Sequence, residues 1–360
     1  MERIPPPQLG IKSQPQRALF LDLFRIFLCS GIVFYHYTPV RPACGAYMVN
    51  AFFVMSGFLL ALAFDRMPQL DLNRFFSAKA LRLLPIYFSG ILIGVALRCF
   101  RAWYAGKSCL DAMLPDYTAE QWGNLCLPEW VAFYDPPLWF VTVELILLLA
   151  APLFFVIFKK RIWFAAFFLL MLGTAGFLYS RVPYMADRGA GLYYSPICRS
   201  WQLLGGMVSA AIYLSLKGKQ CPQWCRYVVR GATLLVVGLF LCGAYVTMTF
   251  KQYADLHCWN FTYEFDVLTV GVFMAVIPLL YRLPNIGGKV VQKWVTWAAL
   301  LTYPVYVTHV LAQSITHSLR LNVVYALLLT LVMSWCLLVA QQYLERLVKK
   351  RRCADSSAVS

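Results

Sequence analysis

The chain is divided into apolar blocks about 20 residues long, and these blocks constrain the fold more than any other feature of the sequence. A helix of about 20 apolar residues crosses a hydrocarbon core about 30 Å thick. Hydrophobic residues make up 61% of the 360 residues and charged residues only 13%, whereas about a quarter of the residues of a soluble domain are charged. The alternative, buried helices of a large soluble core, does not explain this composition. We therefore expect an all-α, polytopic membrane helix bundle.

The hydropathy pattern predicts about ten transmembrane helices. They fall near residues 18–38, 46–64, 85–104, 138–158, 162–180, 196–216, 228–249, 266–281, 296–316 and 322–345. Residues 66–84 are polar and amphipathic, which predicts an interfacial helix that ends before Pro85. The expected organisation is an N-terminal tail at 1–17, one membrane domain at 18–346 and a basic C-terminal tail at 347–360.

The net charge of +16 is interpreted as a topology signal and not as a sign of nucleic-acid binding. If both termini are cytoplasmic, most of the 32 lysines and arginines fall in inner segments, as the positive-inside rule requires. The first apolar segment contains Asp22 and Arg25 and lacks a small-residue cleavage site, so we expect a retained span. The prediction is a multi-pass protein of the inner cell membrane, in contact with lipid and with no nucleic-acid partner.

The twelve cysteines include no CxxC pair, and no His or Cys at zinc spacing accompanies Cys221 and Cys225. No metal site is predicted. Most of the cysteines are interpreted as small buried apolar residues. The candidates for disulfides on the outer side are Cys44, Cys109, Cys126 and Cys258.

The first predicted span contains three ionisable residues, Asp22, Arg25 and His36, and such residues within a membrane are costly and usually functional. Arg25 and His36 are eleven residues apart, which puts them within about 20° of one helix face and about 16 Å apart along the axis. Asp22 precedes Arg25 by one turn and can pair with it. His36 suits a general base because imidazole titrates near neutral pH. A packing histidine bonded to a carbonyl is the alternative, and the aligned arginine favours catalysis.

Three cations follow near the expected inner face. Lys79 and Arg82 are three residues apart on one face of the predicted interfacial helix, and Arg74 adds a third charge. They contact lipid headgroups or bind a phosphate group. A coenzyme A donor carries phosphates and is cytoplasmic, so the location suits the second interpretation.

Further polar residues lie inside or beside later spans. Glu144 is about six residues into the fourth span and requires a cation or hydrogen-bond donors, with His36 or an arginine as the expected partner. Ser56-Gly57 in the second span indicates a small-residue packing site, and a serine nucleophile is the alternative. The loop 105–137 combines carboxylates with tryptophans and is either a solvated lid or part of an acceptor site for sugar.

Together, these segments resemble the integral-membrane acyltransferase-3 family, in family order from residue 18 to about 346. The first helix resembles the Leu-Asp-x-x-Arg opening and the Arg-(ten residues)-His motif, and residues 51–60 resemble the Phe-Phe-Val-Leu-Ser-Gly-Phe stretch. Three later segments match a Trp-Ser-Leu-x-x-Glu, an Arg-x-x-x-Phe-x-x-Gly and a Ser-Tyr-x-x-Tyr-x-x-His pattern through Trp139 and Glu144, Arg199 and Gly205, and Tyr303, Tyr306 and His309.

The chain departs from the family pattern at three places. The family's Arg-x-x-Arg is Lys79-x-x-Arg82 here, which keeps the charge but loses one bidentate fork. Thr302 replaces the usual serine, and the proline that commonly follows the position of Glu345 is missing.

The resemblance implies an acyl-coenzyme A donor, usually acetyl-CoA, and a cell-surface glycan or lipid-linked sugar as acceptor. It implies His36 as the base, assisted by Arg25, Asp22 and Glu144, and a donor site at Lys79, Arg82, Arg25 and Arg74. Substrate contacts are expected from Trp139, Arg199, Tyr303, Tyr306 and His309. A covalent acyl-histidine is an alternative path. A glycan or lipid-linked sugar transporter, or an inactive accessory subunit, is the alternative function.

Overall fold

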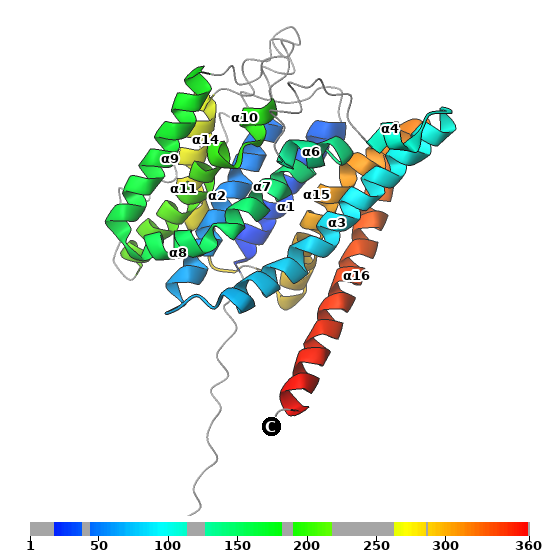
Figure 1. The fold of residues 1–360 in the computed structure, drawn as a ribbon. Coiled ribbons are helices and arrows are strands. Elements are labelled where there is room, and N and C mark those ends of the chain that lie inside the picture. The colour runs from blue at the N-terminus through cyan, green and yellow to red at the C-terminus, as the bar shows by residue number, and fades with distance from the viewer. Residues whose placement is uncertain are drawn as a thin grey trace, which may run out of the picture.

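The computed structural model describes residues 18–37, 44–113, 127–181, 190–217, 263–285 and 287–358. Every regular element in these ranges is a helix, which confirms the all-α bundle (Figure 1). Among the described residues, six helices are long and apolar enough to cross a membrane, or seven if one bent pair is counted as a span. The predicted span at 228–249 lies outside the described residues.

The six long apolar helices are α1 (Leu19–Tyr37), α2 (Cys44–Asp65), α3 (Leu72–Tyr104), α9 (Arg161–Arg181), α15 (Lys289–Ser318) and α16 (Val323–Ala358). The predicted span at 138–158 is bent by 55° at Ala150, between α7 (Leu138–Leu149) and α8 (Ala151–Lys159). Helices also occupy the predicted sixth and eighth spans, α11 (Pro196–Leu216) and α14 (Tyr263–Arg282). The short helices are α4 (Cys109–Met113), α6 (Leu127–Tyr134) and α10 (Ala190–Tyr194).

Helix α3 is a single helix of 33 residues that continues through Pro85, so the prediction of a separate interfacial helix over 66–84 is wrong. A proline removes one backbone donor and frees carbonyls in the preceding turn. Neighbouring helices supply donors there: Tyr303 Oη donates to the carbonyl of Leu83, and Gln341 Nε2 to that of Arg82, each at 2.9 Å. Tertiary hydrogen bonds therefore stabilise a helix that its local sequence would end.

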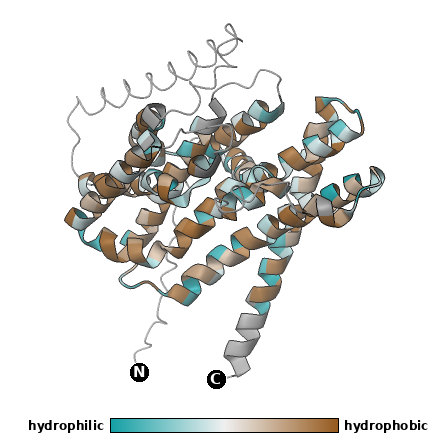
Figure 2. Cartoon of the chain, turned by 45° about the horizontal axis from the view of Figure 1, so that its top comes forward, coloured by the Kyte–Doolittle hydropathy of each residue, from teal (hydrophilic) through white to brown (hydrophobic). Residues whose placement is uncertain are grey.

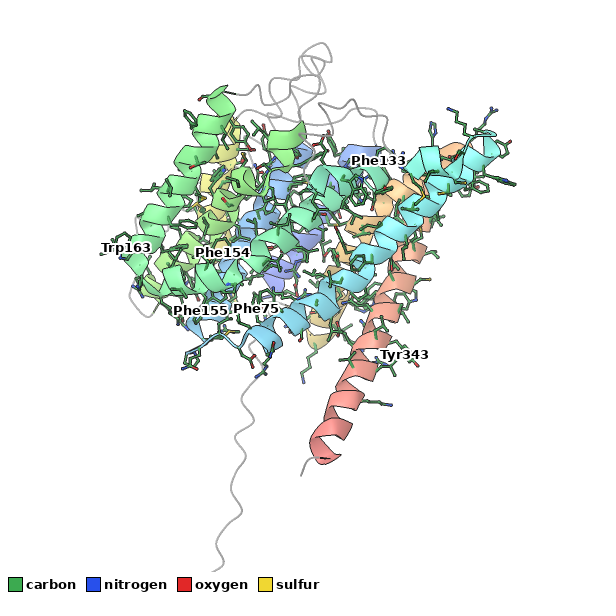
Figure 3. The ribbon with its side chains drawn as sticks, viewed as in Figure 1. Phe75, Phe133, Phe154, Phe155, Trp163 and Tyr343 are labelled. Carbon is green, nitrogen blue, oxygen red and sulfur yellow. The ribbon has the colours of Figure 1, made fainter. Side chains whose placement is uncertain are left out.

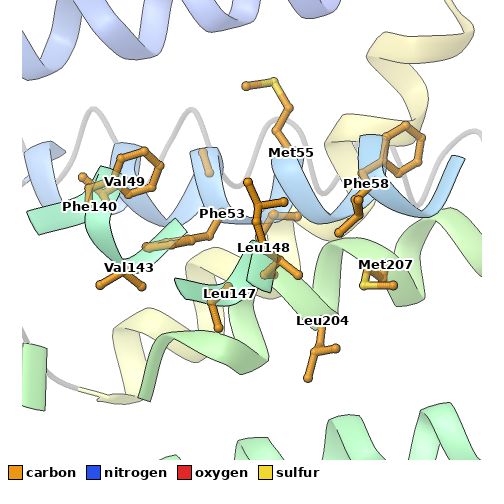
Figure 4. Packing of buried hydrophobic residues seen from close by; sticks show 14 of the residues in the cluster. Val49, Phe53, Met55, Phe58, Phe140, Val143, Leu147, Leu148, Leu204 and Met207 are labelled. Atoms are coloured by element: carbon orange, nitrogen blue, oxygen red, sulfur yellow. The ribbon is translucent and has the colours of Figure 1, made fainter. Parts of the chain in front are cut away.

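The core is built around α2, which packs closely against α11. A Cβ added at Gly57 would lie 1.8 Å from the carbonyl oxygen of Leu203, and one at Gly206 would lie 1.9 Å from that of Val54. Only glycine permits this approach of two helix backbones, so Gly57 is a packing residue. Figure 4 shows apolar side chains of α2, α7 and α11 gathered in the core, among them Phe53, Leu148 and Met207.

Apolar side chains also cover the outside of the bundle. Apolar residues dominate the helices in Figure 2, and Trp163 on α9 and Tyr343 on α16 point outward in Figure 3. These two side chains are 70% and 61% exposed, an arrangement suited to contact with lipid. Helix α16 extends past the rest of the bundle in Figure 1 and continues to Ala358, into the predicted basic tail.

Candidate active site

The last turn of α1 meets the middle of α15 at a pair of histidines. The ring centroids of His36 and His309 are 5.0 Å apart and the rings are tilted by 56°. The Tyr306 ring lies 5.9 Å from that of His309, and both Tyr306 and His309 are buried. Three residues predicted from two distant sequence segments therefore form one cluster, here named the histidine cluster: His36, Tyr306 and His309.

Hydrogen bonds fix α1 against its neighbours at this cluster. Gln313 Nε2 donates to the carbonyl of His36, and Tyr37 Oη donates to the carbonyl of His309, each at 2.7 Å. Tyr37 Oη also lies 2.7 Å from Thr330 Oγ1 on α16. The carbonyls of the last turn of a helix lack partners within the helix, so the Gln313 bond satisfies one of them and holds the His36 backbone on α15.

The first half of α1 belongs to a second cluster, which contains cations. Arg25 Nη1 lies 3.9 Å from Asp22 Oδ1, which shows the predicted ion pair in a loose form. Lys79 on α3 interacts electrostatically with Glu144, Arg82 and Arg25. We name Arg25, Lys79 and Arg82 the cation cluster. Arg74, which precedes Lys79 by five residues in α3, is exposed.

Glu144 lies beside the cation cluster. Its Oε1 accepts a hydrogen bond from Ser56 Oγ at 2.8 Å, and it interacts electrostatically with Lys79 and Tyr303. Within the described residues this Ser56 contact is its only hydrogen bond, whereas the sequence suggests His36 or an arginine as its partner. The structure thus places Glu144 and Tyr303 beside the cation cluster and not beside the imidazole of His36.

Arg199 and Trp139 lie in a third group, in which the charge is neutralised within the protein. Arg199 Nη1 lies 3.1 Å from Asp266 Oδ2 and donates to Asn50 Oδ1 at 3.2 Å. The guanidinium carbon lies 4.2 Å from the Tyr193 ring centroid and 5.6 Å from that of Trp139. Arg199 is 1% exposed, and a buried pair of this kind needs its hydrogen bonds to offset desolvation.

Asn50 and Asp266 are not singled out by the sequence patterns. Asn50 Nδ2 donates to Asp266 Oδ1 at 2.7 Å, which completes the network around Arg199. In the sequence, each is a polar residue within or at the edge of an apolar block. This pattern indicates a buried polar residue but does not identify the partner of that residue. The network links α2, α11 and α14 and holds the Trp139 region in place.

Asp135 is a second residue whose role the sequence does not indicate. It follows α6 in the predicted loop 105–137, yet it is fully buried, so the interpretation of a solvated lid is wrong for this residue. Neither carboxylate oxygen has a hydrogen-bond partner within the described residues. Burial raises the pKa of Asp135 well above 3.8, and the carboxyl interacts electrostatically with Tyr306 of the histidine cluster.

The metal and disulfide predictions are only partly covered by the described residues. No group of three His, Cys, Asp or Glu side chains suited to a metal ion occurs in that part of the chain. Cys109 is a free thiol there, and its Sγ lies 3.6 Å from the carbonyl of Cys99. The side chains of Cys44, Cys126 and Cys258 lie outside the described residues.

The fold and site define a polytopic helical membrane protein in which one helix joins a cation cluster to a histidine cluster. The model of the family described as "Acyltransferase domain" matches residues 19–341. The chain belongs to this acyltransferase-3 family, as the sequence resemblance predicts, and it is a membrane acyltransferase. Searches among curated proteins and among solved structures gave no match.

Proposed function

We propose that the protein transfers an acyl group, usually acetyl, from cytoplasmic acyl-CoA to a hydroxyl of a cell-surface or lipid-linked glycan, with His36 as the general base. The observation that carries the proposal is the placement of both clusters on α1. Arg25 contributes to the cation cluster, and His36 contacts His309 in the histidine cluster. The two residues are separated by about 16 Å along the helix.

The cation cluster suits the phosphates of the donor. Lys79, Arg82 and Arg25 interact through their charges, and the mutual repulsion of three cations is relieved when a phosphate group binds between them. Arg74 is exposed on the same helix and adds attraction for an anionic donor. The positive-inside pattern assigns this end to the cytoplasm, with both termini on the same side of the inner membrane.

At the histidine cluster the reaction requires one base. The acceptor oxygen attacks the thioester carbonyl while His36 takes the hydroxyl proton. The C–O bond forms, the C–S bond breaks, and the proton passes from His36 to the departing sulfur to give free coenzyme A. Nothing else is consumed, so the atoms and charges balance without a metal or a further reactant.

The acceptor is assigned to the aromatic side of the histidine cluster. The Trp139 ring lies 4.7 Å from that of Tyr193 and 5.0 Å from that of Tyr194, and Phe140 joins this group to Tyr306 at 5.5 Å. Closely packed aromatic rings, some of which carry hydroxyls, suit the faces and hydroxyls of a sugar. Trp139 and Tyr306 are therefore the proposed acceptor contacts. Arg199 supports this group through Tyr193, and Tyr303 contributes nearer the donor.

The direct test is acetyl transfer by the purified full-length protein in lipid nanodiscs. We expect release of free coenzyme A from acetyl-CoA when the glycan acceptor is present. We also expect an O-acetyl mass shift in the cell-envelope polysaccharides of cells that carry the gene, compared with cells that lack it. Glycan movement across the membrane without acetyl-CoA consumption would instead indicate a transporter and would overturn the proposal.

A further inference from the structure

The hydrogen bonds of His309 determine which of its ring nitrogens carries the proton. His309 Nδ1 lies 2.7 Å from the carbonyl oxygen of Tyr306 and 3.2 Å from that of Val305. A carbonyl oxygen can only accept, so Nδ1 is the donor and bears the hydrogen. In the neutral ring, Nε2 then carries a lone pair and can only accept.

The Nε2 atom of His309 is buried and has no hydrogen bond among the described residues. His309 is 0% exposed. A buried polar atom of this kind is unusual in a folded protein and marks a site that requires a donor. The neighbouring rings are those of His36, Tyr306 and Tyr37, at centroid separations of 5.0, 5.9 and 6.4 Å.

Among these neighbours, His36 is the donor best placed to act in catalysis. Its ring is the closest, and the two rings are tilted by 56° and are not stacked in parallel. The backbones of both residues are held by 2.7 Å hydrogen bonds from Gln313 and Tyr37. The direction of the ring N–H groups of His36 is therefore set by rotation about its side-chain bonds and not by movement of the helices.

We propose that His309 is a positioning residue for His36, an inference that rests on the proposed function. His309 Nε2 accepts a hydrogen bond from one ring N–H of His36. The other ring nitrogen of His36 is then unprotonated and faces the acceptor hydroxyl. His309 keeps its own Nδ1 proton throughout, and the transferred proton moves only from the hydroxyl to His36 and then to the thiolate sulfur.

A neutral partner suits this location inside a membrane protein. A carboxylate would orient and charge-stabilise His36 more strongly, but burying it costs much more free energy. An imidazole locked by two backbone carbonyls orients His36 without adding a charge. Glu144, the carboxylate that the sequence suggests as a partner of His36, instead accepts a hydrogen bond from Ser56 beside the cation cluster.

The test compares three substitutions in the full-length protein in nanodiscs. His309→Leu removes the acceptor atom, His309→Gln retains a polar atom near the Nε2 position, and His317→Ala alters an exposed histidine eight residues later on α15. We expect His309→Leu to lower kcat about 100-fold or more, the usual range for general-base catalysis, with less than about a threefold change in the KM for acetyl-CoA. His309→Gln should recover part of the loss, and His317→Ala should retain wild-type kcat.

A spectroscopic readout separates orientation from loss of fold. With ¹⁵N-labelled histidine, the His36 signals in the wild type should show a single tautomer, and those in His309→Leu a mixture of two. A single unchanged tautomer in a folded His309→Leu variant, or kcat within about threefold of wild type, overturns the inference. If His309→Leu does not fold, failure of His309→Gln to retain more activity than His309→Asn overturns it. Activity in His36→Ala would instead refute the proposed base.

Discussion

The two ends of α1 differ in the charge of the residues that surround them. At the Arg25 end, the Arg25 side chain is 20% exposed, and Lys79 interacts electrostatically with Arg25, Arg82 and Glu144. At the other end, His36 meets a fully buried neutral ring, and the hydrogen bonds there run mainly to backbone carbonyls. Under the proposed function, the charged end receives the anionic donor, and the end with neutral polar groups is where the proton is moved in a dry environment.

The largest change in donor binding is expected when the cation cluster is removed, and it tests the proposed difference between the two ends of α1. In the double variant Lys79→Ala and Arg82→Ala, the KM for acetyl-CoA should rise at least about 100-fold, because two hydrogen bonds to a charged phosphate are lost and each contributes about 1.5–3 kcal/mol. The value of kcat should change much less, since the histidine cluster is intact. Steady-state kinetics at saturating acceptor measures both quantities.

The control for that variant is Lys293→Ala, which removes an exposed cation of α15. Raising the salt concentration should weaken acetyl-CoA binding to the wild type and to Lys293→Ala alike. The double variant should lose most of this salt dependence. An unchanged KM in the double variant would place the donor site elsewhere.

A smaller effect is expected from the packing that holds the two ends in register. Gly206→Ala puts a Cβ 1.9 Å from the carbonyl oxygen of Val54, so α2 and α11 must separate, at a typical cost of about 1–3 kcal/mol. The apparent unfolding midpoint in nanodiscs should fall by several degrees. Ser56 and Glu144, which are hydrogen-bonded between α2 and α7, should lose alignment beside the cation cluster, which should raise the KM for acetyl-CoA.

Gly271→Ala on α14 is the matched control, because nothing lies within 4 Å of the added Cβ. There the only effect is the gain in helix propensity of about 1 kcal/mol, so the midpoint should stay the same or rise. Equal destabilisation by both substitutions would contradict the close approach of α2 and α11.

The smallest effect is expected at Asp135. Burial raises its pKa above 3.8, so the folded state binds this proton more tightly than the unfolded chain does. The protonated Asp135 therefore contributes its full share to the free energy of unfolding below the pKa that it has in the unfolded chain. This contribution is lost as the pH rises through the pKa that Asp135 has in the folded protein. Asp135→Asn removes that loss, so its unfolding midpoint at pH 7.5 should exceed that of the wild type by about 2 °C or more.

The difference between Asp135→Asn and the wild type should narrow as the pH falls toward 4. The comparison is a thermal scan of both proteins at several pH values, with Asp65→Asn, at an exposed position on α2, as the control. A gap that stays constant with pH would show that ionisation of Asp135 does not contribute.

The parts of the site that lie within one helix were predictable from the sequence. Fixed helix geometry puts Arg25 and His36 on one face and Asp22 one turn before Arg25, and the structure shows the Asp22–Arg25 pair. The apolar blocks likewise predict most helices, because a membrane demands about 20 apolar residues in each span.

The parts that depend on distant residues were not predictable. Pro85 is a strong local signal for a helix end, and it is overridden by donors from Tyr303 and Gln341, more than 200 residues away. The hydrogen bond between Glu144 and Ser56 depends on how α7 lies against α2. The burial of Asp135 depends on how α3, α6 and α7 pack. The position of the proton on His309 follows from the carbonyls of its own helix. That the other ring nitrogen lies close to His36 depends on how α1 packs against α15.

The central claim is that α1 joins a donor site to a separate reaction point, and His36→Ala tests it most directly. Acetyl-CoA binding and acetyl transfer should be measured on the same preparation of folded protein in nanodiscs. The variant should bind acetyl-CoA within about threefold of wild-type affinity and transfer no detectable acetyl group. Normal acetyl transfer by His36→Ala at wild-type protein levels would show that His36 is not the base.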